Sequence, residues 1–338
     1  MSGNAKAAQV RMSAVLGRML LVRETGIFLA LVLMCLFLSL TTDTFLTVGN
    51  LLNVGRQVSL LGIMAIGMTF VLISGEVDLS VGSTYALAGL GTGMLIVAGW
   101  ALLPAVAIGL AIGVSVGVVN GVLATYGRSP SLIATLGRLS VIRGIALLMT
   151  DGQPVTVNVR LGADPAVLSS FQFIGQGYLL GLVPMQLVFF IVVALGAWSL
   201  LANTNFGFRV FAVGGNAKAA RVAGMPVFAV KIWAFVIMGF LAALAGILSL
   251  AFLPSGQAGR TGVGLELDVI AATIVGGASL AGGEGTILGT VLGVLIIGVL
   301  RNGLVLLGIS PFWQETIIGL VIIIAVAIDK WTRARRTA

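Results

Sequence analysis

Long apolar runs, separated by short polar or glycine-rich stretches, repeat along the whole chain. A helix needs about 20 mostly apolar residues to cross a bilayer, and about ten stretches come near that length. They lie at about residues 26–40, 57–74, 80–98, 103–124, 131–150, 184–202, 228–250, 265–282, 285–306 and 312–329. Several are short or interrupted by glycine, which is typical of broken helices. We therefore predict an all-α, polytopic transmembrane helical bundle of about ten spans, including broken or half helices.

The distribution of Lys and Arg predicts the orientation of this bundle, because cytoplasmic loops carry an excess of basic residues. The N-terminal segment 1–25 is basic, and no small-x-small cleavage site follows the first apolar run, so we expect an uncleaved first helix. The loop 203–227 and the tail 330–338 are also basic, whereas the long loop 151–183 contains Arg160 as its only basic residue. Both termini and loop 203–227 are therefore predicted to be cytoplasmic, and loop 151–183 external.

Composition supports a membrane protein and excludes several chemistries. Of 338 residues, 59% are hydrophobic and 9% charged, and a soluble fold of this composition could not cover its surface. A single transmembrane domain, 26–329, would fill most of the chain. The chain has no His and one Cys, which excludes His-based catalysis, His/Cys metal sites and a disulfide framework. We expect no enzyme activity, no cofactor on this chain and no nucleic-acid partner, since the net charge of +8 belongs to loops beside membrane spans.

Glycine is abundant, with 47 residues, about twice its ordinary usage. Helices in lipid gain no hydrophobic reward from touching each other, so small residues that allow close backbone approach hold a bundle together. Gly109, Gly113, Gly117 and Gly121 recur every four residues and so share one face of a helix. This pattern predicts a tightly packed helix rather than a specific function.

The stretch 74–83, Ser-Gly-Glu-Val-Asp-Leu-Ser-Val-Gly-Ser, places two carboxylates between two apolar runs. Acidic residues inside a membrane are costly and commonly mark a transport pathway or gate. Asp78 or Ser80 could instead cap the helix that follows. The predicted topology puts this stretch at the cytoplasmic face, which favours capping, and a functional role of Glu76 and Asp78 stays open.

A second glycine-rich stretch, 264–285, begins with Glu266 and Asp268. A phosphate-binding loop needs Gly-Lys-Ser/Thr at its end, and no Lys occurs between Lys231 and Lys330, so nucleotide binding is excluded. The stretch favours a corner between two short helices, with its acids near helix N-termini. It could also form a mobile gate.

The basic loop 203–227 predicts a short surface helix. Asn216 is a good N-cap, the alanine-rich residues after it favour a helix, and Gly224 ends it. Lys218 and Arg221 would be exposed on this helix. An ordinary basic loop between two spans is the alternative interpretation.

Four motifs occur in order along the chain. They are G-M-T-x-V-x-x-x-G-x-x-D-L-S-V-G-S from Gly67, G-G-N-x-x-A-A-x-x-x-G from Gly214, G-x-G-x-E-L-D-x-I-A-A from Gly262 and S-L-A-G-G-x-G from Ser279. Together they resemble the permease subunit of ATP-binding-cassette sugar importers of the ribose type, over nearly the whole chain. The sequence departs from that family at Glu76, where the family commonly has a small residue.

The resemblance implies a multi-pass permease of the bacterial cytoplasmic (inner) membrane, which forms a dimeric pore with a second copy or a related permease. Such a permease receives its sugar from an external binding protein. A separate ATPase subunit, which carries ATP and Mg, drives it. The resemblance assigns the contact with that ATPase to Gly215, Asn216, Ala219, Ala220 and Gly224. Charge and exposure add Lys218 and Arg221.

We therefore expect a translocation pathway for a monosaccharide or a similar neutral polyol. Only Arg138, Arg143 and Arg301 are candidate cations inside spans, so an anionic substrate would find little compensation, and Arg138 and Arg143 are expected to snorkel to the headgroups. Gate or pathway candidates are Glu76, Asp78, Ser80, Ser115, Asn120, Glu266, Asp268, Thr273 and Asn302. The alternative is an ion-coupled secondary transporter of a small polar solute, which would need ionisable groups near the middle of the membrane.

Overall fold

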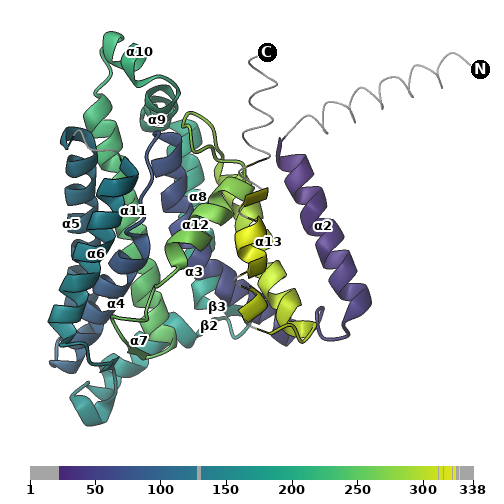
Figure 1. Ribbon diagram of the computed structural model, residues 1–338. Coiled ribbons are helices and arrows are strands. Elements are labelled where there is room, and N and C mark those ends of the chain that lie inside the picture. Colours follow the sequence, from purple (N-terminus) through teal and green to yellow (C-terminus); the bar gives the residue numbers. More distant parts are fainter. Residues whose placement is uncertain are drawn as a thin grey trace, which may run out of the picture.

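Helices dominate the structure, a computed structural model that describes residues 23–127, 131–310, 312–314, 316–321, 323–324 and 327 (Figure 1). The long helices are α2 (Arg23–Thr41), α3 (Val48–Ile73), α4 (Val81–Val97), α5 (Leu102–Tyr126), α6 (Ser131–Thr150), α8 (Met185–Asn203), α11 (Val227–Phe252) and α13 (Ile287–Leu306). The shorter helices are α7 (Pro165–Gln176), α9 (Asn205–Gly215), α10 (Ala217–Val222) and α12 (Leu265–Val275), with a 3₁₀ turn at Val159–Leu161. The all-α prediction is confirmed.

Short strands occur only as local ladders in the described part of the chain. The antiparallel pairs are β1 (Val155–Thr156) with β4 (Ser255–Gly256), and β2 (Tyr178–Leu179) with β3 (Val183–Pro184). Each strand has two residues, so none of them forms a layer of the fold. The predicted loop 151–183 is thus an ordered cap that contains α7, whose first turn is capped by Asp164.

Six described helices are long and apolar enough to span a membrane: α2, α3, α5, α8, α11 and α13. Helix α4 has 17 residues, and α6 has the length of a span but carries Arg138 and Arg143. Each of the ten predicted stretches contains a helix. The number of crossings and the side on which the termini lie stay predictions. Of the predicted end segments, 1–25 is described only at residues 23–25, and 330–338 lies outside the described residues.

Both predicted helix breaks are present. Helix α12 has 11 residues, which is about 16 Å of helix and roughly half of a bilayer core. Helix α3 ends at Ile73, and neither helix nor strand follows until α4 begins at Val81. Irregular backbone is tolerated at membrane depth only where protein surrounds it. Glu76, Asp78 and Ser80 in this break are accordingly buried.

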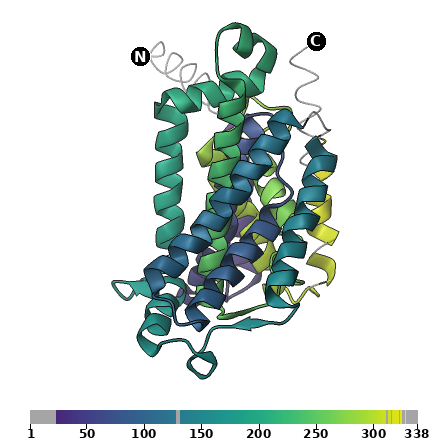
Figure 2. The same cartoon turned by 90° about the vertical axis from the view of Figure 1, so that its left-hand side faces the viewer.

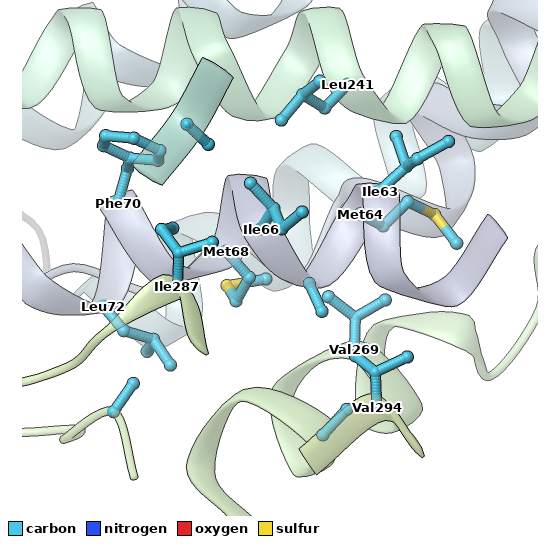
Figure 3. Packing of buried hydrophobic residues seen from close by; sticks show 14 of the residues in the cluster. Ile63, Met64, Ile66, Met68, Phe70, Leu72, Leu241, Val269, Ile287 and Val294 are labelled. Carbon is cyan, nitrogen blue, oxygen red and sulfur yellow. The ribbon is translucent and has the colours of Figure 1, made fainter. Parts of the chain in front are cut away.

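Helix α3 is the centre of the hydrophobic core. Every residue from Leu61 to Ile73 is buried, so this half of the helix touches protein on all sides. Figure 3 shows Leu241 of α11 on one side of α3 and Val269 of α12 and Val294 of α13 on the other. Because α12 packs directly on α3, any movement of this half helix must be accommodated by the core.

The predicted glycine face holds α5 against α11. All four glycines are buried. A Cβ on Gly117 would lie 2.8 Å from the Cα of Val236, and one on Gly121 would lie 2.7 Å from the Cα of Ile232. The two backbones are therefore too close for any side chain between them, and the predicted tight packing is confirmed.

Two groups of short elements lie at opposite ends of the bundle. Helices α9 and α10 lie at one end, and α7 with the short strands lies at the other (Figures 1 and 2). This agrees with the prediction that loops 203–227 and 151–183 face opposite sides. Loop 203–227 holds two helices rather than the single one predicted. The additional helix, α9, is capped by the Thr204 hydroxyl oxygen, which accepts a hydrogen bond from the amide of Gly207 over 3.2 Å. It buries Val210 and Val213, and a threonine cap followed by apolar residues three apart is a helix signal that the sequence contains.

Candidate functional site

Four glycines join the end of α3, the end of α9 and the loop between α12 and α13. The amide of Gly283 donates to the carbonyl oxygen of Ile73 over 2.8 Å. A Cβ on Gly282 would lie 2.7 Å from the carbonyl oxygen of Gly214 and 2.9 Å from the Cα of Gly75. We call Gly75, Gly214, Gly282 and Gly283 the glycine junction. It joins the base of α10 to both helix breaks through backbone contacts, with no flexible side chain between them.

Helix α10 follows the glycine junction and has the predicted cap. The Oδ1 atom of Asn216 accepts the backbone N–H groups of Lys218 at 3.1 Å and Ala219 at 3.0 Å. Gly224 follows the helix with a φ of +78°, a left-handed conformation that favours glycine. The sequence prediction of a capped surface helix is confirmed.

The coupling candidates differ in what they can present to a partner. Gly215, Lys218, Ala219 and Arg221 are exposed, whereas Ala220 is buried and packs α10 on the rest of the chain. The guanidinium of Arg221 lies 4.8 Å from the ring centroid of Phe228. Val222, which the sequence analysis did not single out, is 91% exposed at the end of α10.

Glu76 and Asp78 belong to a buried polar cluster, which we define as Glu76, Asp78, Ser80, Asn120, Arg138 and Lys231. The Nζ atom of Lys231 lies 2.6 Å from Oε1 of Glu76. Asp78 Oδ1 accepts the amide of Ser80 at 2.9 Å and its hydroxyl at 2.7 Å, and Asn120 Nδ2 donates to the Ser80 hydroxyl at 2.7 Å. The Ser80 side chain makes no cap bond to α4, so capping by Ser80 is wrong. Its hydroxyl instead joins the break to α5.

The expectation that Arg138 and Arg143 snorkel to the headgroups is wrong. Arg138 is 7% exposed, and its Nη1 atom donates to the carbonyl oxygen of Asn120 over 2.5 Å. Arg143 donates through Nη1 to the carbonyl oxygens of Ala258, at 2.7 Å, and Thr261. Both guanidinium groups therefore donate hydrogen bonds to backbone carbonyl oxygens inside the protein. These partners are far away in the sequence, so the sequence alone does not indicate them.

Breaking the pair of Glu76 and Lys231 should destabilise the protein. Their side chains are only 9% and 17% exposed, so Glu76→Gln or Lys231→Met alone leaves a poorly solvated charge and should cost about 3 kcal/mol. The double variant removes both charges and should be close to the wild type. Thermal unfolding of the wild type, the two single variants and the double variant, all in one detergent, gives the coupling free energy between the two side chains. Additive losses in the double variant would show that the two side chains do not interact.

A cavity of about 200 Å³ lies between α3, α4, α12 and α13, and its mainly apolar wall carries a few polar and charged side chains. We call it the central cavity; its lining includes Gln57, Leu61, Met64, Tyr85, Asp268 and Arg301. The Nη2 atom of Arg301 lies 2.7 Å from Oδ2 of Asp268. Leu60 and Leu61, which flank the midpoint of α3, both line it, so the cavity lies at mid-depth of a central span.

A second cavity, of about 210 Å³, is lined by residues of α4, the C-terminal part of α11 and the segment 253–262 that follows it. We call it the outer cavity; Gly89, Ser249, Ser255, Thr261 and Gly262 are among its lining residues. Tyr85 lines both cavities and is 6% exposed. Tyr85 is thus the one lining residue that the two cavities share.

The other pathway candidates do not gather at the central cavity. Thr273 is fully buried and donates to the Val269 carbonyl at 2.6 Å, and Asn302 pairs with Asn50 at 2.7 Å. Ser115 and Asn120 line a separate, mainly apolar groove of about 410 Å³ between α5 and α6. Glu266 is half-buried, beside Gly82. Asp268 alone of the predicted pathway residues lines the central cavity.

Sequence reasoning missed three residues that the fold brings into the site. Gln57 and Tyr85 line the central cavity, and Lys231 neutralises Glu76. A polar residue in the middle of an apolar run, such as Gln57, was the available signal. Among the described residues, no group of three or more acidic or Cys side chains lies close enough to hold a metal ion.

Broken helices around a mid-depth cavity that holds a carboxylate and a guanidinium are typical of a transport permease that crosses the membrane many times. A family model described as "Branched-chain amino acid transport system / permease component" matches residues 50–326, and the chain belongs to this permease family. It is therefore a multi-pass protein of the bacterial inner membrane. No solved structure matches the chain.

Three relatives show the similarity over most of the chain. The ribose import permease protein RbsC of Bacillus subtilis is 44% identical over 308 residues, which cover 91% of this chain and 93% of the relative. RbsC of Escherichia coli K12 is 41% identical over 306 residues, covering 90% and 93%. The L-arabinose ABC transporter permease protein AraH of Azospirillum brasilense is 38% identical over 318 residues, covering 94% and 91%.

Proposed function

We propose that this chain is the membrane subunit of an ATP-driven importer and carries a monosaccharide or similar neutral polyol through the central cavity. The observation that carries this proposal is the lining of that cavity. It holds one carboxylate and one guanidinium, paired at 2.7 Å, with an amide and a phenol beside them. The opposite charges cancel, so the cavity suits a neutral solute with several hydroxyl groups. The relatives named for ribose and arabinose import support this substrate class.

A partner ATPase would supply the energy through α10. The helix is capped, carries exposed Lys218 and Arg221, and ends in the exposed apolar side chain of Val222. Its base is the glycine junction, which contacts both helix breaks. Closure of the ATPase pair would thereby shift α10 as a unit and move the broken helices between inward-open and outward-open states. ATP and Mg stay on the partner, and an external binding protein delivers the sugar.

A second copy of the chain, or a related permease, would cover the open side of the central cavity. Gln57 is exposed on this side, and the side chain of Arg301 is 32% exposed. Polar and charged groups at mid-depth are costly against lipid. A seam between two permease subunits gives these groups a wet environment, and it makes the cavity part of a shared pathway.

Transport by the reconstituted complex tests the proposal. The permease is co-purified with its proposed partner ATPase and binding protein and placed in proteoliposomes. Uptake is then measured for radiolabelled pentoses, hexoses, inositol and anionic sugar acids. We expect uptake of a neutral sugar that requires ATP and loaded binding protein. Preference for an acid, abolished by Arg138→Gln or Arg143→Gln, would contradict the substrate class. Uptake driven by a proton or sodium gradient without ATP would support the secondary-transporter alternative.

A further inference from the structure

The central cavity combines three kinds of group that recognise sugars. A sugar ring has an apolar C–H face, which packs on an aromatic ring, and hydroxyl groups, which donate and accept hydrogen bonds in fixed directions. Tyr85 offers an aromatic ring, Arg301 offers donors, Asp268 offers acceptors and Gln57 offers both. All four line one cavity of about 200 Å³, a space on the scale of one sugar ring.

Two polar groups at the cavity have hydrogen-bonding capacity that no residue of the described chain uses. Arg301 uses Nη2 for Asp268, and its Nε atom is buried with no hydrogen-bond partner among the described residues. A buried donor without a partner is costly, so a shift of the Arg301 side chain that brings this N–H group to a ligand hydroxyl gains the full bond. Gln57 is exposed, and no hydrogen bond to its side chain occurs within the described part of the chain. Both groups are available without breaking an existing contact.

The helices around the cavity place it at the point where the two helix breaks meet. Helix α12 begins at Leu265 and α4 at Val81, and Leu265 itself lines the cavity. A Cβ on Gly82 would lie 2.7 Å from Glu266 Oε2, so the two helix starts are in contact. Discontinuous helices at mid-depth are where membrane transporters commonly hold their solute. The glycine junction lies at the far end of the same breaks, so movement there changes the shape of this cavity.

We infer that the central cavity is a transient binding site for one neutral monosaccharide, with Tyr85 as the partition that the sugar passes on its way from the outer cavity. The inference rests on the proposed function and adds its binding residues. The sugar ring packs on Tyr85, a pair of adjacent hydroxyls bridges Asp268 and Arg301, and Gln57 binds a further hydroxyl. The site is neutral overall and small, so it favours pentoses and hexoses over charged sugars and disaccharides.

A structural role for the pair of Asp268 and Arg301 is the competing explanation. This ion pair joins α12 to α13, and breaking it from either side would leave a charge unpaired. The decisive variants are therefore Gln57→Leu and Tyr85→Leu, which touch neither partner of the pair. Tyr85→Phe keeps the ring and removes only the hydroxyl. Tyr126→Leu is the matched control, because Tyr126, the last residue of α5, lines neither cavity and is 61% exposed.

Weak binding to the complete permease in nanodiscs can be measured by saturation-transfer NMR with D-ribose, L-arabinose and ribonate as probes. We expect both neutral sugars to bind the wild type, with the strongest transfer to ring C–H protons, and ribonate to bind at least about tenfold more weakly. Gln57→Leu and Tyr85→Leu should each weaken sugar binding about tenfold, while Tyr85→Phe and Tyr126→Leu retain it.

Uptake by the same variants in the reconstituted complex separates this inference from the proposed function. One outcome is that the wild type imports a neutral sugar with ATP and that Gln57→Leu and Tyr85→Leu bind and import this sugar as well as the wild type does. This outcome would overturn the binding site and leave the proposed function intact. A wild type with no ATP-driven uptake of any neutral sugar would overturn the proposed function itself. Folding of each variant is checked by thermal unfolding, so a loss of binding with an unchanged melting temperature supports the site.

Discussion

Replacing Gly215 by Trp should abolish ATP-driven uptake while the membrane bundle stays folded. Gly215 ends α9 and is exposed, and a Cβ on it would meet no atom within 4 Å. A bulky side chain therefore fits this chain but projects from the base of α10, where we propose that the ATPase docks. A tryptophan that keeps the ATPase from docking removes the contacts at the centre of this proposed interface. The loss of such contacts commonly weakens binding tenfold or more, so we expect uptake to fall at least about tenfold.

Three measurements on the reconstituted complex check this expectation. ATP-driven uptake and the stimulation of ATP hydrolysis by loaded binding protein should both be lost, and the melting temperature should be unchanged. Gly49→Trp is the matched control, because Gly49 is also exposed with open space and lies on α3, away from α10. Gly224→Trp should act in the same direction, with some strain added because Gly224 has a φ of +78°. Full uptake by both Gly215→Trp and Gly224→Trp would remove α10 from the mechanism.

Local signals in the sequence predicted the surface helix well. The cap of α10 depends on Asn216 and two amides two and three residues further on, so a short stretch of sequence contains the whole interaction. The glycine face of α5 was predictable for the same reason, because a spacing of four residues sets one helical face. The breaks at the ends of α3 and α12 also follow from local glycines.

Pairings across the fold were out of reach of the sequence alone. Lys231 lies 155 residues from Glu76, and Arg301 lies 33 residues from Asp268. Nothing near Glu76 in the sequence indicates that a lysine on α11 neutralises it. The same limit explains why Arg138 and Arg143 were expected at the headgroups. Their carbonyl partners lie on other elements, and only the packed bundle brings them within hydrogen-bond distance.

The candidate pathway shows this limit most clearly. Asp268 was predicted from its place beside a glycine-rich corner, but the cavity that gives it a role is also built by Gln57 and Tyr85, from α3 and α4. Thr273 and Asn302 have the same polar character as good pathway residues, yet the fold uses them to tie helices together. Residue type alone therefore identified polar positions inside the spans, and packing decided which of them line the central cavity.

The close contact of α5 with α11 predicts the largest loss of stability. A Cβ on Gly113 would overlap the carbonyl oxygen of Gly239 and the Cβ of Ala243, and two packed backbones cannot yield as a flexible side chain could. Gly113→Val should therefore force the helices apart along the whole face, at a cost of at least about 3 kcal/mol. We expect a markedly lower melting temperature and a smaller yield of monodisperse protein in detergent.

Gly196→Val on α8 separates this packing effect from the general effect of replacing glycine in a membrane helix. Gly196 is exposed, and a Cβ there would meet no atom within 4 Å. The Gly196→Val variant should therefore melt at the temperature of the wild type. It could melt slightly higher, because valine restricts the unfolded chain more than glycine does. Equal stability of Gly113→Val and Gly196→Val would mean that α5 and α11 can separate freely. In that case α5 would be a movable helix of the transport cycle rather than part of the rigid frame against which the broken helices move.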